Sequence, residues 1–367
     1  TINVGSNDGV AVIYGNDQKA DLIANDINIT AVNQNKLIYG VKDADIKNMT
    51  FKGKVNKELF SVVGGKVKDS TFTYTNAENE DSRSITSDAG LEKELTFINT
   101  KIENAPTFTK GAMNNTGINS KVVADDLSTV NGGKMVDIAD VKLAVAQIGD
   151  KYYTSLKDAI AAAQDGDTVT LANDVTESIK IDEGKAITLD LNGKTLTNTD
   201  GKHTIENYGA LVVEDGSQDK TGKVDNITNG RISFVNYEGG VATLNGGSFD
   251  RSLENGKVGA TDKGCNSCYT IKNWGIMTIN ENVSVNNNTD SQGGSSAIGN
   301  GYQNGANFDK HTNVTSANVK LTINGGKFTG GLNTIKNDDW AILEVHGGVF
   351  ENNTQPVSYT HLRAHET

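Results

Sequence analysis

The chain has few of the residues that crosslink or stiffen small folds, with two cysteines and two prolines in 367 residues. Two thiols cannot form the dense disulfide framework of a small secreted scaffold. The scarcity of proline and the lack of a three-residue glycine period exclude a collagen-like chain. No run of 18 apolar residues occurs, so the sequence predicts no segment that crosses a membrane.

Basic residues are also in the minority. There are 34 lysines and arginines against 46 aspartates and glutamates, which gives a net charge of −12. A phosphate-binding surface needs the opposite sign, so we expect no nucleic-acid partner. Insertion into an anionic membrane is disfavoured for the same reason. An acidic surface favours solubility and suits a secreted or cell-wall protein.

Residues that form turns and short strands are plentiful instead. Glycine occupies 40 positions, and asparagine, aspartate and threonine are abundant. Asparagine, threonine and glycine are poor helix formers, which argues against a helical bundle. The composition therefore predicts a β-rich protein with many turns.

A short unit recurs along the chain. The unit LTINGGKF at 321–328 returns 22 residues later as LEVHGGVF at 343–350, and ATLNGGSF stands at 242–249. Looser copies at 46–51 and 67–72 are 21 residues apart. Each unit alternates apolar and polar residues before a turn, which predicts a strand followed by a corner. Three short strands and three corners fill about 22 residues, so we predict an all-β fold, a parallel β-helix.

The alternation also predicts which side chains point into the core. Between residues 168 and 350 the predicted inward residues are Val169, Leu171, Leu189, Leu211, Val213, Leu244, Ile323 and Val345.

One segment departs from the β pattern. Residues 155–163 form a helical pattern in which Leu156, Ile160 and Ala163 make one apolar stripe. Thr154 or Ser155 can cap its start. A solenoid exposes an open end of apolar core and unpaired backbone, so we predict that this helix covers the end of a second solenoid.

The chain therefore divides near residues 140–150. We predict a partial β-helix of about six coils at 1–140 and a capped β-helix of about nine coils at 148–355, with a long lateral loop at 286–315. Thr1 is not a methionine and no signal peptide follows it, so we expect a piece of a longer protein. Residues 356–367 (PVSYTHLRAHET) resemble a translated sequencing-adapter tail, and the alternative is a genuine short tail.

Three segments carry a family resemblance. Residues 152–160 (YYTSLKDAI), 165–171 (DGDTVTL) and 187–196 (ITLDLNGKTL) resemble the start of pectate-lyase-like β-helix modules of bacterial cell-surface proteins. The resemblance implies a right-handed parallel β-helix with an N-terminal capping helix. It implies an extracellular or cell-wall location but no particular chemistry, since that family includes polysaccharide lyases, glycoside hydrolases and adhesin-like proteins.

The chemistry-bearing residues give no catalytic set. A Ca²⁺ site of the lyase type needs carboxylates that converge from neighbouring coils. The acidic pairs Asp125–Asp126 and Asp338–Asp339 have no acidic partner pair one period away. We therefore predict no catalytic residue, no metal and no cofactor. The motif Cys265-Asn-Ser-Cys268 is either a loop-closing disulfide or two free thiols.

Aromatic residues give the most specific signal. Tyr208, Trp274 and Trp340 each stand three residues before a predicted strand and are spaced by 66 residues, which is three periods of 22. A row of flat rings along one flank could stack on sugars, and the alternative is that each ring packs on the core. We expect an extracellular, adhesin-like or structural protein without catalysis that contacts a glycan. The second candidate is a carbohydrate-active enzyme.

Overall fold

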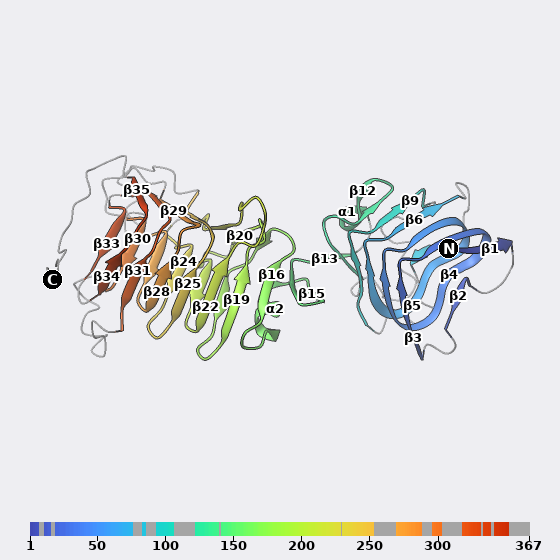
Figure 1. Ribbon diagram of the computed structural model, residues 1–367, viewed down its shortest axis with the longest axis horizontal. Helices are drawn as coiled ribbons and strands as arrows, with labels where there is room; N and C mark the ends of the chain where they lie inside the picture. Colours follow the sequence, from blue (N-terminus) through green and yellow to red (C-terminus); the bar gives the residue numbers. More distant parts are fainter. Residues whose placement is uncertain are drawn as a thin grey trace. The chain divides into compact units, whose positions relative to one another are not determined.

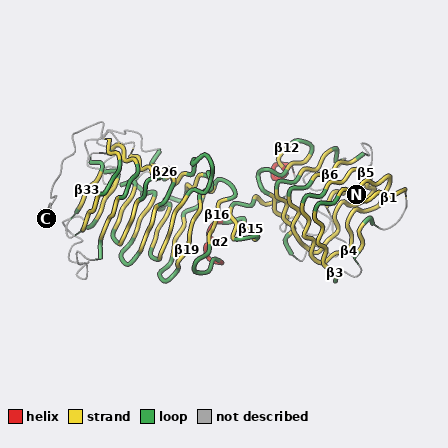
Figure 2. Tube along the Cα trace, in the orientation of Figure 1, coloured by secondary structure: helices red, strands yellow, loops and turns green. Residues whose placement is uncertain are grey.

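The computed structural model divides into two compact units, Thr1–Ala144 and Val145–Thr367. Both units consist almost entirely of β-strands (Figures 1 and 2). The helices of the described residues, α1 (Met135–Ile138) and α2 (Leu156–Ala162), are short. The structure describes residues 1–6, 11–15, 19–75, 83–85, 93–105, 122–138, 141–228, 230–252, 269–287, 296–302, 318–331, 333–338 and 341–351.

The first unit is built on one thirteen-stranded sheet. The long strands β4 and β5 pair in parallel, with Ile29 opposite Phe51 and Ile46 opposite Val67. The start of β5 then pairs with β6 and its end with β8, so one strand follows two sides of a coil. The strands are β1 (Ile2–Ser6), β2 (Ile13–Tyr14), β3 (Ala20–Asn25), β4 (Asn28–Lys47), β5 (Thr50–Lys68), β6 (Thr71–Tyr74), β7 (Arg83–Ile85), β8 (Leu95–Ile98), β9 (Lys101–Glu103), β10 (Val122–Ala124), β11 (Thr129–Val130), β12 (Gly133–Lys134) and β13 (Lys142–Leu143).

The corners of the first unit use asparagine and aspartate in a left-handed conformation. Asp26, Asn48, Asp69 and Asn99 have φ of 56°, 53°, 50° and 44°. These residue types tolerate that conformation better than other side chains. Successive corners also bond to one another, because Asn48 Nδ2 donates to Asp26 Oδ1 at 3.0 Å and Asn99 Nδ2 donates to Asp69 Oδ1 at 2.8 Å.

The second unit has three stacked sheets, and each coil contributes one strand to each sheet. This confirms the predicted parallel β-helix, and Figure 1 shows the ranks of strands from β16 to β34. The largest sheet contains β15 (Lys151–Tyr153), β14 (Ala146–Ile148), β16 (Thr168–Leu171), β19 (Ala186–Asp190), β22 (Ala210–Glu214), β25 (Val241–Leu244), β28 (Ile276–Ile279), β31 (Lys320–Ile323) and β34 (Ile342–Val345).

The other two sheets close the coil. The seven-stranded sheet contains β17 (Val175–Thr176), β20 (Thr195–Thr197), β23 (Lys223–Asp225), β26 (Gly247–Asp250), β29 (Val283–Asn287), β32 (Lys327–Gly330) and β35 (Val349–Glu351). The six-stranded sheet contains β18 (Ile179–Ile181), β21 (Ile205–Asn207), β24 (Phe234–Asn236), β27 (Ile271–Asn273), β30 (Ile298–Asn300) and β33 (Ile335–Asn337).

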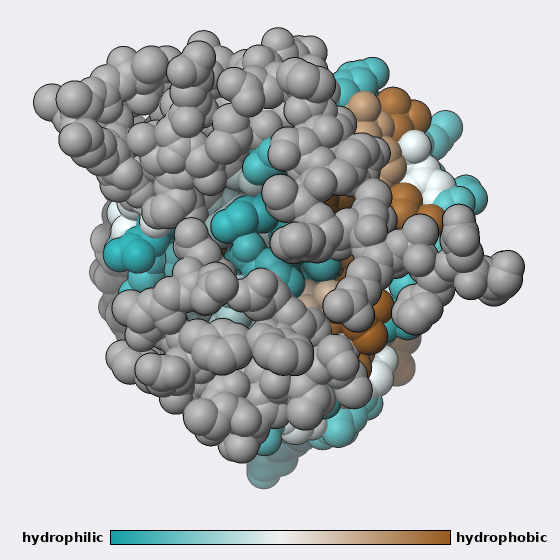
Figure 3. All heavy atoms as spheres, turned by 90° about the vertical axis from the view of Figure 1, so that its left-hand side faces the viewer, coloured by the Kyte–Doolittle hydropathy of each residue, from teal (hydrophilic) through white to brown (hydrophobic). Residues whose placement is uncertain are grey.

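The core consists of columns of apolar side chains in register. All predicted inward residues are buried except Val345, which is 48% exposed. Val345 lies opposite the buried Ile323. The prediction of burial is wrong because no described strand of that sheet stacks beyond β34. Viewed from the C-terminal side, the visible described atoms include hydrophobic groups among hydrophilic ones (Figure 3).

The coils vary in length, which the predicted even period did not allow for. Of the nine strands in the largest sheet, β14 and β15 pair antiparallel, and the remaining seven mark seven coils rather than about nine. Successive inward residues are 20 apart from Val169 to Leu189 but 44 apart from Ile279 to Ile323.

The predicted lateral loop at 286–315 is also wrong as a single loop. Strand β30 lies within it, and Ile298 in that strand is fully buried. Residues 288–295, 303–317 and the tail 356–367 lie outside the described residues.

Helix α2 covers the start of the second unit, as predicted. Ser155 is its N-cap, and Leu156, Ala159 and Ile160 are buried in the core. Two charged side chains of the first coil hold its ends. Glu177 accepts the backbone N–H groups of Leu156 and Lys157 at 2.9 and 3.1 Å, and Lys185 Nζ donates to the carbonyls of Ile160 and Ala163 at 2.7 and 2.8 Å. Each charge therefore opposes the partial charge of its helix end.

A second interior feature is an asparagine ladder, formed by the last residue of five successive strands of the six-stranded sheet. Each side chain donates its Nδ2 to the Oδ1 of the next at 2.7–2.8 Å. Four of the five are fully buried. The amides also bond to turn carbonyls, as when Asn273 Nδ2 donates to Lys320 O at 3.0 Å. The members are Asn207, Asn236, Asn273, Asn300 and Asn337.

The helical cap yields a first prediction. Leu156→Asp places an unpaired carboxylate in the core beside Glu177, so we expect the free energy of unfolding to fall by about 3 kcal/mol. Lys157→Asp places the same charge on the exposed side of the same helical turn and should change it by less than about 1 kcal/mol. Thermal and chemical unfolding of the two variants tests this, and equal stability of both would show that α2 is not a cap.

The asparagine ladder yields a second prediction. Asn273→Leu keeps the volume but leaves the amide of Asn236, the carbonyl oxygens of Asn300 and Lys320, and the Gly275 N–H without their partner. We expect a loss of roughly 3–5 kcal/mol in unfolding free energy. Asn324→Leu is the matched control, because Asn324 is exposed and bonds only to its neighbour Asn280 in the exposed row at another corner. A loss as large for Asn324→Leu would contradict the special role of the buried ladder.

Candidate functional site

The most regular surface feature is a column of aromatic rings beside the asparagine ladder. Tyr208, Tyr237 and Trp274 directly follow three ladder residues in sequence, and Tyr302 lies two residues after Asn300. We call Tyr208, Tyr237, Trp274 and Tyr302 the aromatic column. Because the ladder fixes the register of these strands, each coil places one ring on the same flank.

The rings of the aromatic column contact one another. Tyr208 and Tyr237 stack with centroids 4.2 Å apart and planes 4° apart, and Trp274 and Tyr302 stack at 5.6 Å and 6°. Tyr237 and Trp274 are tilted by 54° at 5.4 Å. Aromatic pairs at these separations are favourable beyond the area that they bury. The column therefore also stiffens the flank.

The structure brings together two of the three predicted ligand-binding residues. Tyr208 and Trp274 share the column, but they are two coils apart and not the three that the 66-residue spacing suggested. Trp340 lies outside the described residues. Sequence reasoning missed Tyr237 and Tyr302, although the recurring Asn-Tyr and Asn-Trp pairs at 207–208, 236–237 and 273–274 are a usable signal.

The ring contacts limit what the column can offer to a ligand. Neighbouring rings flank Tyr237 and Trp274 on both sides, and the side chains of Tyr208, Tyr237 and Trp274 are half-buried. Their exposed parts are therefore ring edges and hydroxyl groups rather than free faces. Tyr237 Oη donates to Glu206 Oε1 at 2.9 Å, and Tyr302 Oη donates to Glu238 Oε2 at 3.5 Å.

Burial and the adjacent carboxylates raise the pKa of both tyrosines above the ordinary value. Both hydroxyls are consequently neutral hydrogen-bond donors at physiological pH. The flank thus combines aromatic edges with tyrosine hydroxyls and two carboxylates.

Two lysines border the aromatic column. Lys180 Nζ lies 5.0 Å from the ring centroid of Tyr208 and 2.7 Å from Asp182 Oδ1. Lys272 is buried, and its Nζ lies 3.3 Å from Asp338 Oδ2 and 5.8 Å from the Trp274 centroid. Burial lowers the pKa of Lys272 to about 8, although the charge of Asp338 opposes this shift.

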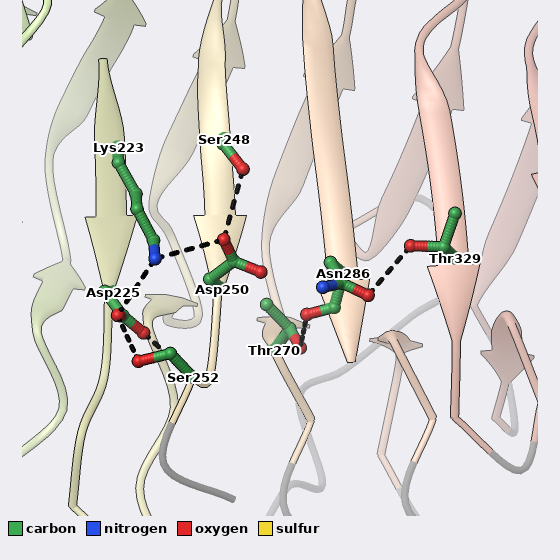
Figure 4. Close-up of polar contacts among 8 residues, drawn as sticks. All are labelled: Lys223, Asp225, Ser248, Asp250, Ser252, Thr270, Asn286 and Thr329. Atoms are coloured by element: carbon green, nitrogen blue, oxygen red, sulfur yellow. Dashed lines mark hydrogen bonds and ion pairs between the residues drawn. The ribbon is translucent and has the colours of Figure 1, made fainter. Parts of the chain in front are cut away.

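A polar cluster lies on the outward side of the seven-stranded sheet (Figure 4). Lys223 Nζ lies 3.2 Å from Asp225 Oδ2 and 3.4 Å from Asp250 Oδ2. The two aspartates stand opposite each other on adjacent strands, 25 residues apart. A search at the 22-residue period could not find this pair, because the coil between them is longer. Further along the same sheet, Thr329 Oγ1 donates to Asn286 Oδ1 at 2.8 Å.

The charge state of this cluster follows from its contacts. Burial opposes the charge of Lys223, but the two carboxylates outweigh burial and raise its pKa. Lys223 therefore stays protonated and acts as a counter-ion rather than as a base. Ser252 adds a backbone N–H bond to Asp225 Oδ1 at 2.9 Å and a hydroxyl bond to Oδ2.

The histidines in the described part of the chain have structural surroundings. His203 Nδ1 accepts the backbone N–H of Ile232 at 3.0 Å, and burial lowers its pKa. His346 is exposed and continues the row of Asn245, Asn280 and Asn324 at another corner. His311, Cys265 and Cys268 lie outside the described residues.

Two general searches cover the described residues. No group of three or more histidine, cysteine, aspartate or glutamate side chains is arranged there to hold a metal ion. No helix in that part of the chain is long and apolar enough to cross a membrane.

Comparisons of the chain with protein-family models, with curated proteins and with solved structures find no match.

Proposed function

We propose that this protein is an extracellular β-helix with an adhesin-like or structural role, and that its aromatic column contacts glycans. The observation that carries the proposal is the repetition of one aromatic side chain per coil on a single flank, with hydroxyls and carboxylates beside it. The extracellular or cell-wall location rests on the acidic net charge and on the resemblance of residues 152–196 to bacterial surface modules.

The chemistry of the flank suits sugar hydroxyls. The carboxylates of Glu206 and Glu238 accept hydrogen bonds, and the edges of Tyr208 and Trp274 offer apolar surface for C–H groups. Since neighbouring rings already stack on one another, we propose edge contacts and hydrogen bonds in place of the face-on stacking that the sequence suggested.

The spacing of the flank suits a long ligand. Adjacent coils are about 4.8 Å apart, so a polymer that lies along the solenoid contacts several coils. Each contact after the first is effectively intramolecular, which allows weak contacts to add up. A rigid flank also reduces the ordering that binding would otherwise require.

A carbohydrate-active enzyme is the second candidate, and the cluster of Lys223, Asp225 and Asp250 favours it. Two carboxylates on adjacent coils are the arrangement that a polysaccharide lyase or hydrolase needs. The protonated Lys223 between them argues against a lysine base at this place. Release of unsaturated or reducing ends from pectin, measured with and without Ca²⁺ and lost in Asp250→Asn, would establish this alternative.

The proposal predicts that affinity for a bound polysaccharide rises with the length of its oligosaccharides. Trp274→Ala removes the ring that joins the two halves of the column, so we expect about tenfold weaker binding, equivalent to about 1.4 kcal/mol. Glycan arrays identify a ligand, and calorimetry with oligosaccharides of increasing length measures the affinity.

The matched control is Tyr14→Ala, which removes an exposed ring of the first unit that stacks on Tyr39. Its binding should equal that of the unchanged protein. Thermal unfolding of both variants separates lost contacts from lost fold. Equal weakening by Tyr14→Ala and Trp274→Ala, or affinity that does not depend on length, would contradict binding along the column.

A further inference from the structure

The pair of Lys272 and Asp338 differs from the other ion pairs of the described residues. Its side chains are 4% and 7% exposed, whereas each of the others has at least one partner that is more than a quarter exposed. Burying two charges costs free energy that their attraction often fails to offset. A buried pair of this kind therefore favours neutral products if a reaction can form them.

The surroundings of the amine are aromatic and closed. Lys272 Nζ lies 4.5 Å from the ring centroid of Tyr269 and 5.8 Å from that of Trp274. Tyr269 occupies the space above Gly299, where an added Cβ would approach its ring atoms to 2.7 Å. Gly299 stands in register between Lys272 and Lys336, so the coil between the two reacting residues carries no side chain at this position.

We propose that Lys272 and Asp338 condense to an intramolecular isopeptide bond. The distance from Nζ to Oδ2 is 3.3 Å, which is within the range of a near-attack arrangement. The pair would join β27 to the turn after β33, across 66 residues of sequence and two coils. The crosslink would act as a covalent clamp on the flank that carries the aromatic column.

The reaction balances without any other reactant. A proton passes from the ammonium to the carboxylate, which gives a neutral amine and a neutral acid. Nζ then bonds to Cγ, the bond from Cγ to Oδ2 breaks, and Oδ2 leaves as water with the transferred proton and a second proton from nitrogen. One N–H remains in the amide, and nothing is oxidised or reduced. Burial lowers the pKa of Lys272 to about 8, which makes the neutral amine accessible.

Lys336 completes the arrangement. Its Nζ lies 3.0 Å from Asp338 Oδ1, the oxygen that stays in the amide. A cation at this place stabilises the negative charge that develops on Oδ1 when the amine attacks. The two lysines therefore have separate roles, with Lys272 as the nucleophile and Lys336 as the group that stabilises the oxyanion.

Mass spectrometry of the folded protein tests the bond directly. We expect an intact mass lower than the sequence mass by one water molecule, and a proteolytic fragment in which Lys272 and Asp338 are joined. Mapping is essential, because aspartates before glycine, such as Asp165, Asp200 and Asp215, also lose water when they cyclise. Lys272→Arg and Asp338→Ala should both keep their full sequence mass at these positions.

The chain contains its own control. Lys93 and Asp43 lie at the same distance of 3.3 Å, but they are 51% and 48% exposed, so they should remain unlinked. Lys336→Met should slow the loss of water roughly tenfold in freshly refolded protein. An unmodified Lys272 peptide in the unchanged protein, a water loss that maps elsewhere, or a loss that persists in Lys272→Arg would overturn the proposal. An unchanged rate in Lys336→Met would overturn the role of Lys336.

Discussion

The second unit depends on how its buried corner satisfies polar groups. A chain that turns inside a solenoid leaves backbone carbonyls and N–H groups without water, and each would be costly if unpaired. The asparagine ladder solves this at one corner, because each amide bonds to the next coil and to turn carbonyls at the same time. The ladder begins at Asn207, where the preceding strand has Ile181 in the equivalent position. Stacking and turning are thus achieved by one repeated side chain.

The ladder also determines where the surface groups lie. A residue that directly follows a ladder asparagine leaves the sheet in the same direction in every coil, so Tyr208, Tyr237 and Trp274 stack. The coil that has Gly301 after the ladder places its ring one residue later, at Tyr302. The interior pattern therefore generates the exterior column, and the chemistry of the flank follows from the packing of the core.

The sequence was sufficient for the features that local patterns carry. Alternation with glycine corners predicted the parallel β-helix and seven of the eight inward residues, and the apolar stripe at Leu156 and Ile160 predicted the capping helix. It failed where an even period was assumed. The coil between Asp225 and Asp250 has 25 residues and the coil from Ile279 to Ile323 has 44, so equivalent positions could not be found by counting. Contacts that depend on the register across such coils, including the stacked rings and the Lys272–Asp338 pair, need the three-dimensional pairing.

Variable coil length and constant register are two sides of one design. Insertions enter between strands, outside the three sheets, so they leave the pairs Asn236–Asn273 and Asn273–Asn300 unchanged. Lys272 and Asp338 are 66 residues apart and still meet, because only the number of coils between them sets their distance. A loop can therefore change in length or sequence without moving the flank. The flank itself can change only one residue per coil at a time, which restricts its ligands to those that match the spacing of the coils.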